Sequence, residues 1–145
     1  MVNRIRRKVV KGNGFSTVED DNPFIAYLYK ETGRDKEAVS ILKNSITRDE
    51  DLLRNRSHFW MDRFVKSRLA ASYALSGENR KSLEYLSELG NSGIFGLIFD
   101  INKFPGFDNL RNDPEFKAIV KRIEHEQDSL RAQVKEMELR GEIDL

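Results

Sequence analysis

The chain has 145 residues, a length typical of one domain that buries a hydrophobic core of its own. Hydrophobic residues make up 39% and charged residues 34%, and the formal net charge is +1. This balance argues for a soluble domain and against a general nucleic-acid binder. The sequence holds no cysteine, so disulfides, zinc–thiolate sites and thiol nucleophiles are excluded.

Residues 1–19 are predicted to form a basic, flexible N-terminal arm, because five of the first eleven residues are lysine or arginine. Two readings stay open: a solvated arm or linker, and a small basic patch that binds an anionic membrane or nucleic acid. The arm lacks the apolar run of a signal peptide, and no segment of the sequence approaches the roughly 18 apolar residues that cross a bilayer. We expect a cytoplasmic location; a periplasmic one stays open if the chain belongs to a membrane-anchored regulator.

Residues 20–145 predict one helical domain, whose first hairpin covers about residues 20–47. Asn22 supplies a capping side chain, and Pro23 follows at the first helical position, where its missing N–H costs nothing. Gly33 ends this helix as a left-handed residue does, and the short turn forces the next helix to lie antiparallel. That second helix starts at Asp35 and has small or apolar residues at spacings of three and four: Ala38, Val39, Ile41, Leu42, Ser45 and Ile46.

A charged segment, residues 48–57, separates this hairpin from the next, and we expect it to be a connector that is helical in part. The second predicted hairpin covers about residues 57–90. Ser57 caps its first helix, Gly77 ends that helix, and Asn79 starts a second one that runs to about Leu89.

The third predicted hairpin is irregular and covers about residues 94–140. A short helix near 94–102 leads into a Phe-Pro-Gly-Phe turn at 104–107. Residues 112–115, Asn-Asp-Pro-Glu, are the strongest helix start in the chain, and nothing breaks the helix that follows until Gly141. No stretch of the sequence alternates between apolar and polar residues, so the expected fold is all-α.

The first two hairpins overlay as an internal repeat when Gly33 is aligned with Gly77, which lies 44 residues later. Both glycines supply a turn with positive φ, and Tyr29 and Tyr73 are expected to fill the space between adjacent hairpins. Small residues let the two helices of a hairpin approach closely. The remaining matched positions are Ile25-Ala26 with Leu69-Ala70, Ala38 with Ser82, and Leu42 with Leu86.

This pattern resembles the tetratricopeptide repeat family over roughly residues 20–51 and 63–93, most closely in the motif Leu-Ala-x-x-Tyr-x-x-x-Gly that ends at Gly77. The repeats are 44 residues apart, whereas the family period is about 34, which leaves room for an extended helix between them. The resemblance implies a right-handed stack of about two and a half antiparallel hairpins with a long C-terminal capping helix. The chain departs from the family pattern at two positions. Asn22 and Lys66 stand where the family has tryptophan, and Glu50 stands where it has the terminal proline.

Residues 104–141 carry a second resemblance. Their Phe-Pro-Gly-Phe-Asp-Asn-Leu-Arg-Asn-Asp-Pro-Glu-Phe motif, followed by a helix rich in Glu, Arg and Gln, is similar to a chain ending of tetratricopeptide regions. That ending occurs in bacterial multidomain regulators such as winged-helix activators, nucleotide cyclases and Ser/Thr kinases. The resemblance implies a role in a bacterial regulatory system.

In the tetratricopeptide family, the first helix of each hairpin lines an inner, concave face. Carried over position by position, the resemblance implies an apolar groove here that suits a peptide or a partner helix. The alternative is that the chain's own C-terminal helices cover this stripe. The predicted partner-binding residues are Tyr27, Lys30, Glu31, Trp60, Phe64, Ser67, Ala71 and Leu75.

The last predicted helix offers a second candidate surface. A helix of about 27 residues is roughly 40 Å long, which is more than one hairpin can cover. Its apolar residues keep the 3–4–3–4–3 spacing of a coiled-coil seam, so it either pairs with a second copy in a homodimer or caps the last repeat. The possible dimer seam consists of Val120, Ile123, Gln127, Leu130, Val134 and Met137.

Candidates for chemistry are few, because His58 and His125 are the only histidines and no third metal ligand accompanies His125. We therefore expect no enzyme, no metal and no cofactor. The expected function is a protein–protein interaction module that binds a peptide or partner helix of another protein, without direct contact to nucleic acid. The alternatives are an oligomerisation domain that dimerises through the C-terminal helix, or, less favoured, a small-ligand sensor or enzyme.

Overall fold

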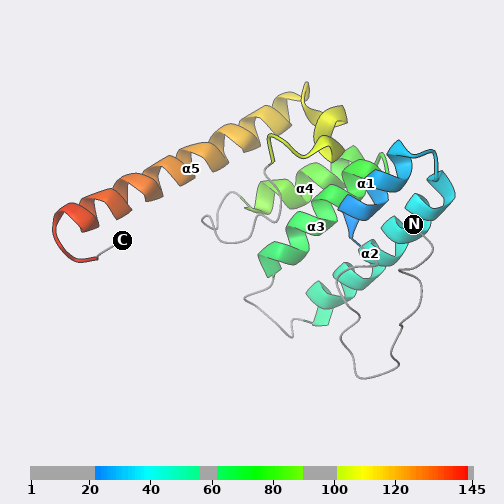
Figure 1. The fold of residues 1–145 in the computed structure, drawn as a ribbon, viewed down its shortest axis with the longest axis horizontal. Helices are drawn as coiled ribbons and strands as arrows, with labels where there is room; N and C mark the ends of the chain where they lie inside the picture. The colour runs from blue at the N-terminus through cyan, green and yellow to red at the C-terminus, as the bar shows by residue number, and fades with distance from the viewer. Residues whose placement is uncertain (1–21, 56–61, 90–100, 144–145) are drawn as a thin grey trace.

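The computed structural model describes residues 22–55, 62–89 and 101–143, and over these ranges it is helical without strands (Figure 1). The predicted all-α class is thereby confirmed. The basic arm, Trp60 and most of the predicted helix near 94–102 lie outside these ranges. The elements are α1 (Pro23–Glu31), α2 (Asp35–Asn55), α3 (Asp62–Leu75), α4 (Asn79–Leu89), the 3₁₀ helix η3 (Pro105–Leu110) and α5 (Pro114–Leu139).

The turns from α1 to α2 and from α3 to α4 are built alike. Gly33 and Gly77 have φ angles of +71° and +81°, as predicted for bends that end a helix. After each glycine the next amide donates back across the turn, Arg34 to the Tyr29 carbonyl at 2.8 Å and Glu78 to the Tyr73 carbonyl at 2.9 Å. This closure satisfies carbonyls that a helix end leaves without partners.

Small residues lie where the helices of each pair pack together. Ala26 and Ala38 are fully buried between α1 and α2, and Ala70 and Ser82 take the matching places between α3 and α4. The Ser82 hydroxyl donates to the Ala70 carbonyl at 2.7 Å, so this polar side chain is satisfied inside the pair. Both pairs thus use the same steric device at positions that the sequence alignment matched.

The contact between the two hairpins, α2 against α3, is polar at its centre. Asp49 is fully buried and accepts two hydrogen bonds from the Arg68 guanidinium, one of them from Nε at 2.9 Å. One helical turn away the hydroxyls of Ser45 and Ser72 lie 3.3 Å apart. Neither of these buried polar pairs was predicted from the sequence.

The boundary expected near residue 47 is wrong, because α2 continues to Asn55. Residues 48–55 are thus helical, as expected in part, but they belong to the packed helix α2 and are not a connector between hairpins. Besides the ion pair of Asp49, the half-buried Leu52 and Leu53 pack against the cluster that Val65, Leu69 and Tyr73 form. This burial stabilises the extension despite its high charge.

The third hairpin differs from the prediction in the described part of the chain. Residues 101–103 form a turn rather than the end of a helix, and the expected turn at 104–107 leads into η3. Phe104, Phe107 and Leu110 are all buried in the main core. The loop from η3 to α5 then ends at the predicted cap, where Asp113 accepts from the Glu115 amide at 2.8 Å.

Helix α5 has two different halves. Its N-terminal half buries Phe116, Ile119, Val120 and Ile123 in the main core, whereas its C-terminal half extends beyond the other helices (Figure 1). The helix ends at Leu139, and Gly141 follows shortly after with φ of +68°, as predicted. No helix in the ranges that the structure describes is long and apolar enough to cross a membrane.

Candidate partner-binding site

The predicted concave stripe is largely internal. Ser67, Ala71 and Leu75 are buried, so they do not form an open stripe along the concave face. Tyr27 is half-buried, with its ring centroid 6.3 Å from that of Phe104. The assignment of Tyr27, Ser67 and Ala71 to a partner surface, and of Leu75 to the concave face, is therefore corrected.

The chain itself covers that stripe, which is the alternative that the sequence left open. Phe104 also lies against Phe24, with ring centroids 6.5 Å apart, and η3 packs along α3. At the far end Asn109 donates to the Ala74 carbonyl at 3.3 Å. Of the other predicted residues, Lys30, Glu31 and Phe64 are exposed, Phe64 to 38%, and Trp60 lies outside the described ranges.

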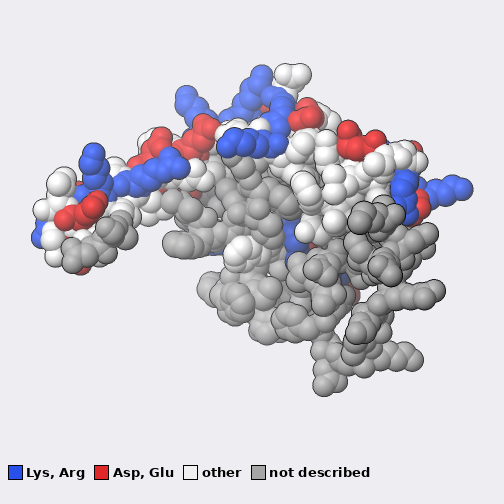
Figure 2. All heavy atoms as spheres, in the orientation of Figure 1, with Lys and Arg blue, Asp and Glu red and all other residues white. Residues whose placement is uncertain are grey.

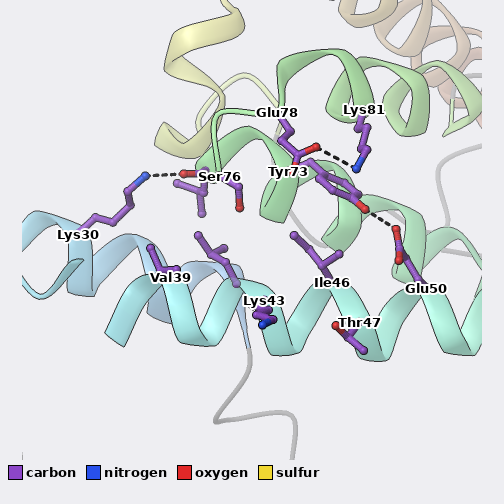
Figure 3. Close-up of a pocket in the computed structure, with 12 residues that line it drawn as sticks. Lys30, Val39, Lys43, Ile46, Thr47, Glu50, Tyr73, Ser76, Glu78 and Lys81 are labelled. Atoms are coloured by element: carbon purple, nitrogen blue, oxygen red, sulfur yellow. Dashed lines mark hydrogen bonds and ion pairs between the residues drawn. The ribbon is translucent and has the colours of Figure 1, made fainter. Parts of the chain in front are cut away.

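A hollow of about 480 Å³ opens instead between the two hairpins, where α2 faces the turn from α3 to α4 (Figure 3). We call it the inter-hairpin groove. Its floor is apolar and includes Leu42, Ile46 and Leu75, and Val39 lies at its edge with 61% of its surface exposed. Two predicted site residues, Lys30 and Leu75, line this groove, although it is not the concave face that the resemblance implied.

Three lysines border the inter-hairpin groove, and two of them are engaged within the protein. Lys30 donates to the Leu75 carbonyl, which places its charge at the negative end of α3. Lys81 pairs with Glu78 at 2.9 Å and lies 4.7 Å from the centroid of the Tyr73 ring. Lys43 forms no hydrogen bond or ion pair with any residue that the structure describes, so its ammonium is available.

Tyr73 closes the end of the inter-hairpin groove that lies away from Lys30, and its hydroxyl donates to Glu50 (Figure 3). Tyr73 also stacks on Tyr85, with ring centroids 5.8 Å apart and planes 6° from parallel. Burial, and then the hydrogen bond to Glu50, raise the pKa of the Tyr73 hydroxyl well above its usual value. Burial raises the pKa of Tyr85 as well.

The free energy of unfolding is expected to fall as the pH rises above about 10, the usual pKa of tyrosine. The unfolded chain releases the Tyr73 proton there while the folded chain still holds it, so the stabilisation is complete below that pH and declines above it. Tyr73→Phe should flatten this decline, as measured by urea unfolding between pH 8 and pH 11. Identical pH profiles for the two proteins would contradict the role of Tyr73.

The possible dimer seam on α5 is shorter than predicted. Val120 and Ile123 are buried in the chain's own core, so a second copy cannot pack against them. Val134 remains 40% exposed. Acidic and basic side chains are mixed along the C-terminal half of α5 (Figure 2). They form exposed pairs such as Arg131 with Asp128 at 3.0 Å, and such pairs contribute little to the stability of the fold. The seam residues not covered by the core are Gln127, Leu130, Val134 and Met137.

The described residues contain no group of three or more His, Cys, Asp or Glu side chains that could hold a metal ion. His125 is exposed on α5, and His58 lies outside the described ranges.

Sequence reasoning missed the residues that α2 contributes to the inter-hairpin groove, because the resemblance directed attention to the first helix of each hairpin. One signal was present. Val39, Lys43, Ile46 and Thr47 follow one another at helical spacing, and all four line the groove.

Comparisons with known proteins do not assign a family. No family model matches the chain, and neither a curated protein nor a solved structure matches it. The likeness to tetratricopeptide repeats therefore rests on the residues and turns of this chain alone.

Proposed function

We propose that the protein is an interaction module that binds a segment of another protein in the inter-hairpin groove. We further propose that its helices form a tetratricopeptide-like stack, capped by α5, in a bacterial regulatory system. The matched turns at Gly33 and Gly77 and the matched small residues support the stack. The resemblance of residues 104–141 to the ending of regulator chains supports the context.

The observation that carries the proposal is an exposed aliphatic side chain beside a hollow with an apolar floor. Val39 is 61% exposed and lines the groove together with the buried Leu42 and Leu75. Covering the exposed part of this side chain stabilises a complex by about 1–2 kcal/mol, and a bound peptide side chain over the floor adds to this. The groove therefore suits a short segment with at least one apolar residue.

Val39→Asp is expected to weaken binding of peptides that are selected on the immobilised wild-type protein from a random-peptide phage library. A carboxylate at the groove edge would have to be desolvated by the bound peptide, which should raise the Kd at least tenfold. Fluorescence anisotropy with the synthesised peptides measures this. Val39 is exposed, so circular dichroism should show an unchanged fold.

Val134→Asp on α5 is the matched control, since Val134 is also an exposed valine on a helix. It should bind the selected peptides as the wild type does. Selected peptides that bind both variants equally well would place the site elsewhere and contradict the proposal.

Dimerisation through α5 is the second candidate, and the uncovered Leu130, Val134 and Met137 favour it. These few apolar side chains offer little surface for a stable interface, which commonly buries about 1,200–2,000 Å². We therefore place peptide binding first. A dimer in analytical ultracentrifugation that Val134→Asp dissociates would reverse this order.

A further inference from the structure

We infer that the inter-hairpin groove selects an acidic segment, one in which an aspartate or glutamate lies next to an apolar residue. This inference rests on the proposed function and adds the chemistry of the partner.

The charge that the inter-hairpin groove leaves uncompensated is positive. Its lining holds three lysines and two glutamates. Both glutamates have internal partners, since Glu50 accepts from Tyr73 and Glu78 pairs with Lys81. Lys43 has no such partner among the described residues. A partner carboxylate would therefore find an available ammonium, whereas a partner ammonium would have to compete for acids that are already bound.

The two ends of the inter-hairpin groove differ in charge. Lys30 and Val39 lie near one end, Lys43 lies between the ends, and the Glu50–Tyr73 contact lies at the other (Figure 3). Lys43 follows Val39 by four residues on α2, so the two side chains are neighbours on one face of the helix.

This placement fixes how an acidic segment would lie. Its carboxylate pairs with Lys43, and its apolar neighbour covers Val39 and the floor at Leu42, at the end where Lys30 lies. A carboxylate displaced from Lys43 toward the other end of the groove would approach Glu50, where like charges repel. The inter-hairpin groove therefore selects for a carboxylate beside an apolar side chain.

The test uses three fluorescein-labelled octapeptides, which alternate leucine with glutamate, leucine with lysine, or serine with glutamate. Fluorescence anisotropy with the full chain at low salt should show the leucine–glutamate peptide binding at least tenfold more tightly than the other two. Added salt should weaken this binding, because the Lys43 pair lies at the surface. Lys43→Glu should raise the Kd of the leucine–glutamate peptide at least tenfold and improve binding of the leucine–lysine peptide.

Lys117→Glu is the matched control, because Lys117 is an exposed lysine on α5 and the substitution changes the net charge equally. It should leave all three affinities within twofold of the wild type. Equal binding of the leucine–glutamate and leucine–lysine peptides, or no binding of the former, would overturn the acidic selectivity. The proposed function survives that result if phage-selected peptides still lose binding in Val39→Asp, and fails with it if they do not.

Discussion

Phe107→Ala is expected to lower the free energy of unfolding by about 3–5 kcal/mol, the usual effect of truncating a buried phenylalanine. Phe107 is among the largest fully buried side chains of the described residues. Its ring meets that of Phe104 edge-on, with centroids 5.4 Å apart, and lies 5.9 Å from that of Phe116. The substitution therefore opens a cavity where η3, α5 and the covered face of α3 meet.

Urea unfolding followed by circular dichroism measures this loss of stability. The same substitution at an exposed phenylalanine serves as the control with which the loss is compared. Phe24 is 45% exposed, so Phe24→Ala should cost about 1 kcal/mol, in keeping with the partial burial of that ring. A loss at Phe107 as small as that at Phe24 would mean that η3 is not part of the core. The concave stripe would then be an open groove after all.

The helix ends of this protein were predictable from the sequence because their causes are local. Asn22 accepts from the Phe24 amide at 2.9 Å, and Asp113 makes the same contact at the start of α5. Gly33, Gly77 and Gly141 adopt positive φ at the ends of α1, α3 and α5. Each feature depends on a few consecutive residues, which is the information that a sequence gives directly.

The residues that cover an apolar stripe can lie far from it in the sequence, so the sequence alone did not predict what covers the stripe here. The spacing of Ser67, Ala71 and Leu75 shows that these residues share one face of a helix. It does not say whether a partner or the chain's own residues 104–110 lie against that face. The same ambiguity affected Val120 and Ile123, because a core helix and a coiled-coil seam share the same spacing.

The length of α2 was missed for a related reason. Residues 48–55 look like a charged connector until Asp49 is paired with Arg68, which lies 19 residues further along the chain. When a segment is buried through a pair of charges that lie far apart in the sequence, neither segment shows the apolar periodicity that would predict the burial. This ion pair, together with the packing of Leu52 and Leu53, holds the extension of α2 against α3, and its share can be tested directly.

Arg68→Met is expected to destabilise the protein by about 3–5 kcal/mol, because it leaves the Asp49 carboxylate buried without its main partner. Arg48, whose Nε lies 3.1 Å from the same carboxylate, is more exposed and compensates only in part. Urea unfolding gives the loss, and helix content from circular dichroism should fall if the end of α2 frays.

Adding Asp49→Leu to Arg68→Met should restore most of the lost stability, since a buried ion pair replaced by apolar residues of similar size is often neutral or stabilising. A double-mutant cycle then gives the coupling energy of the pair. No recovery in the double variant would show that the loss came from packing of the Arg68 stem and not from an unpaired charge. Recovery would mean that the Asp49–Arg68 pair mainly fixes how α2 and α3 align, because the hairpins would then remain stable without it.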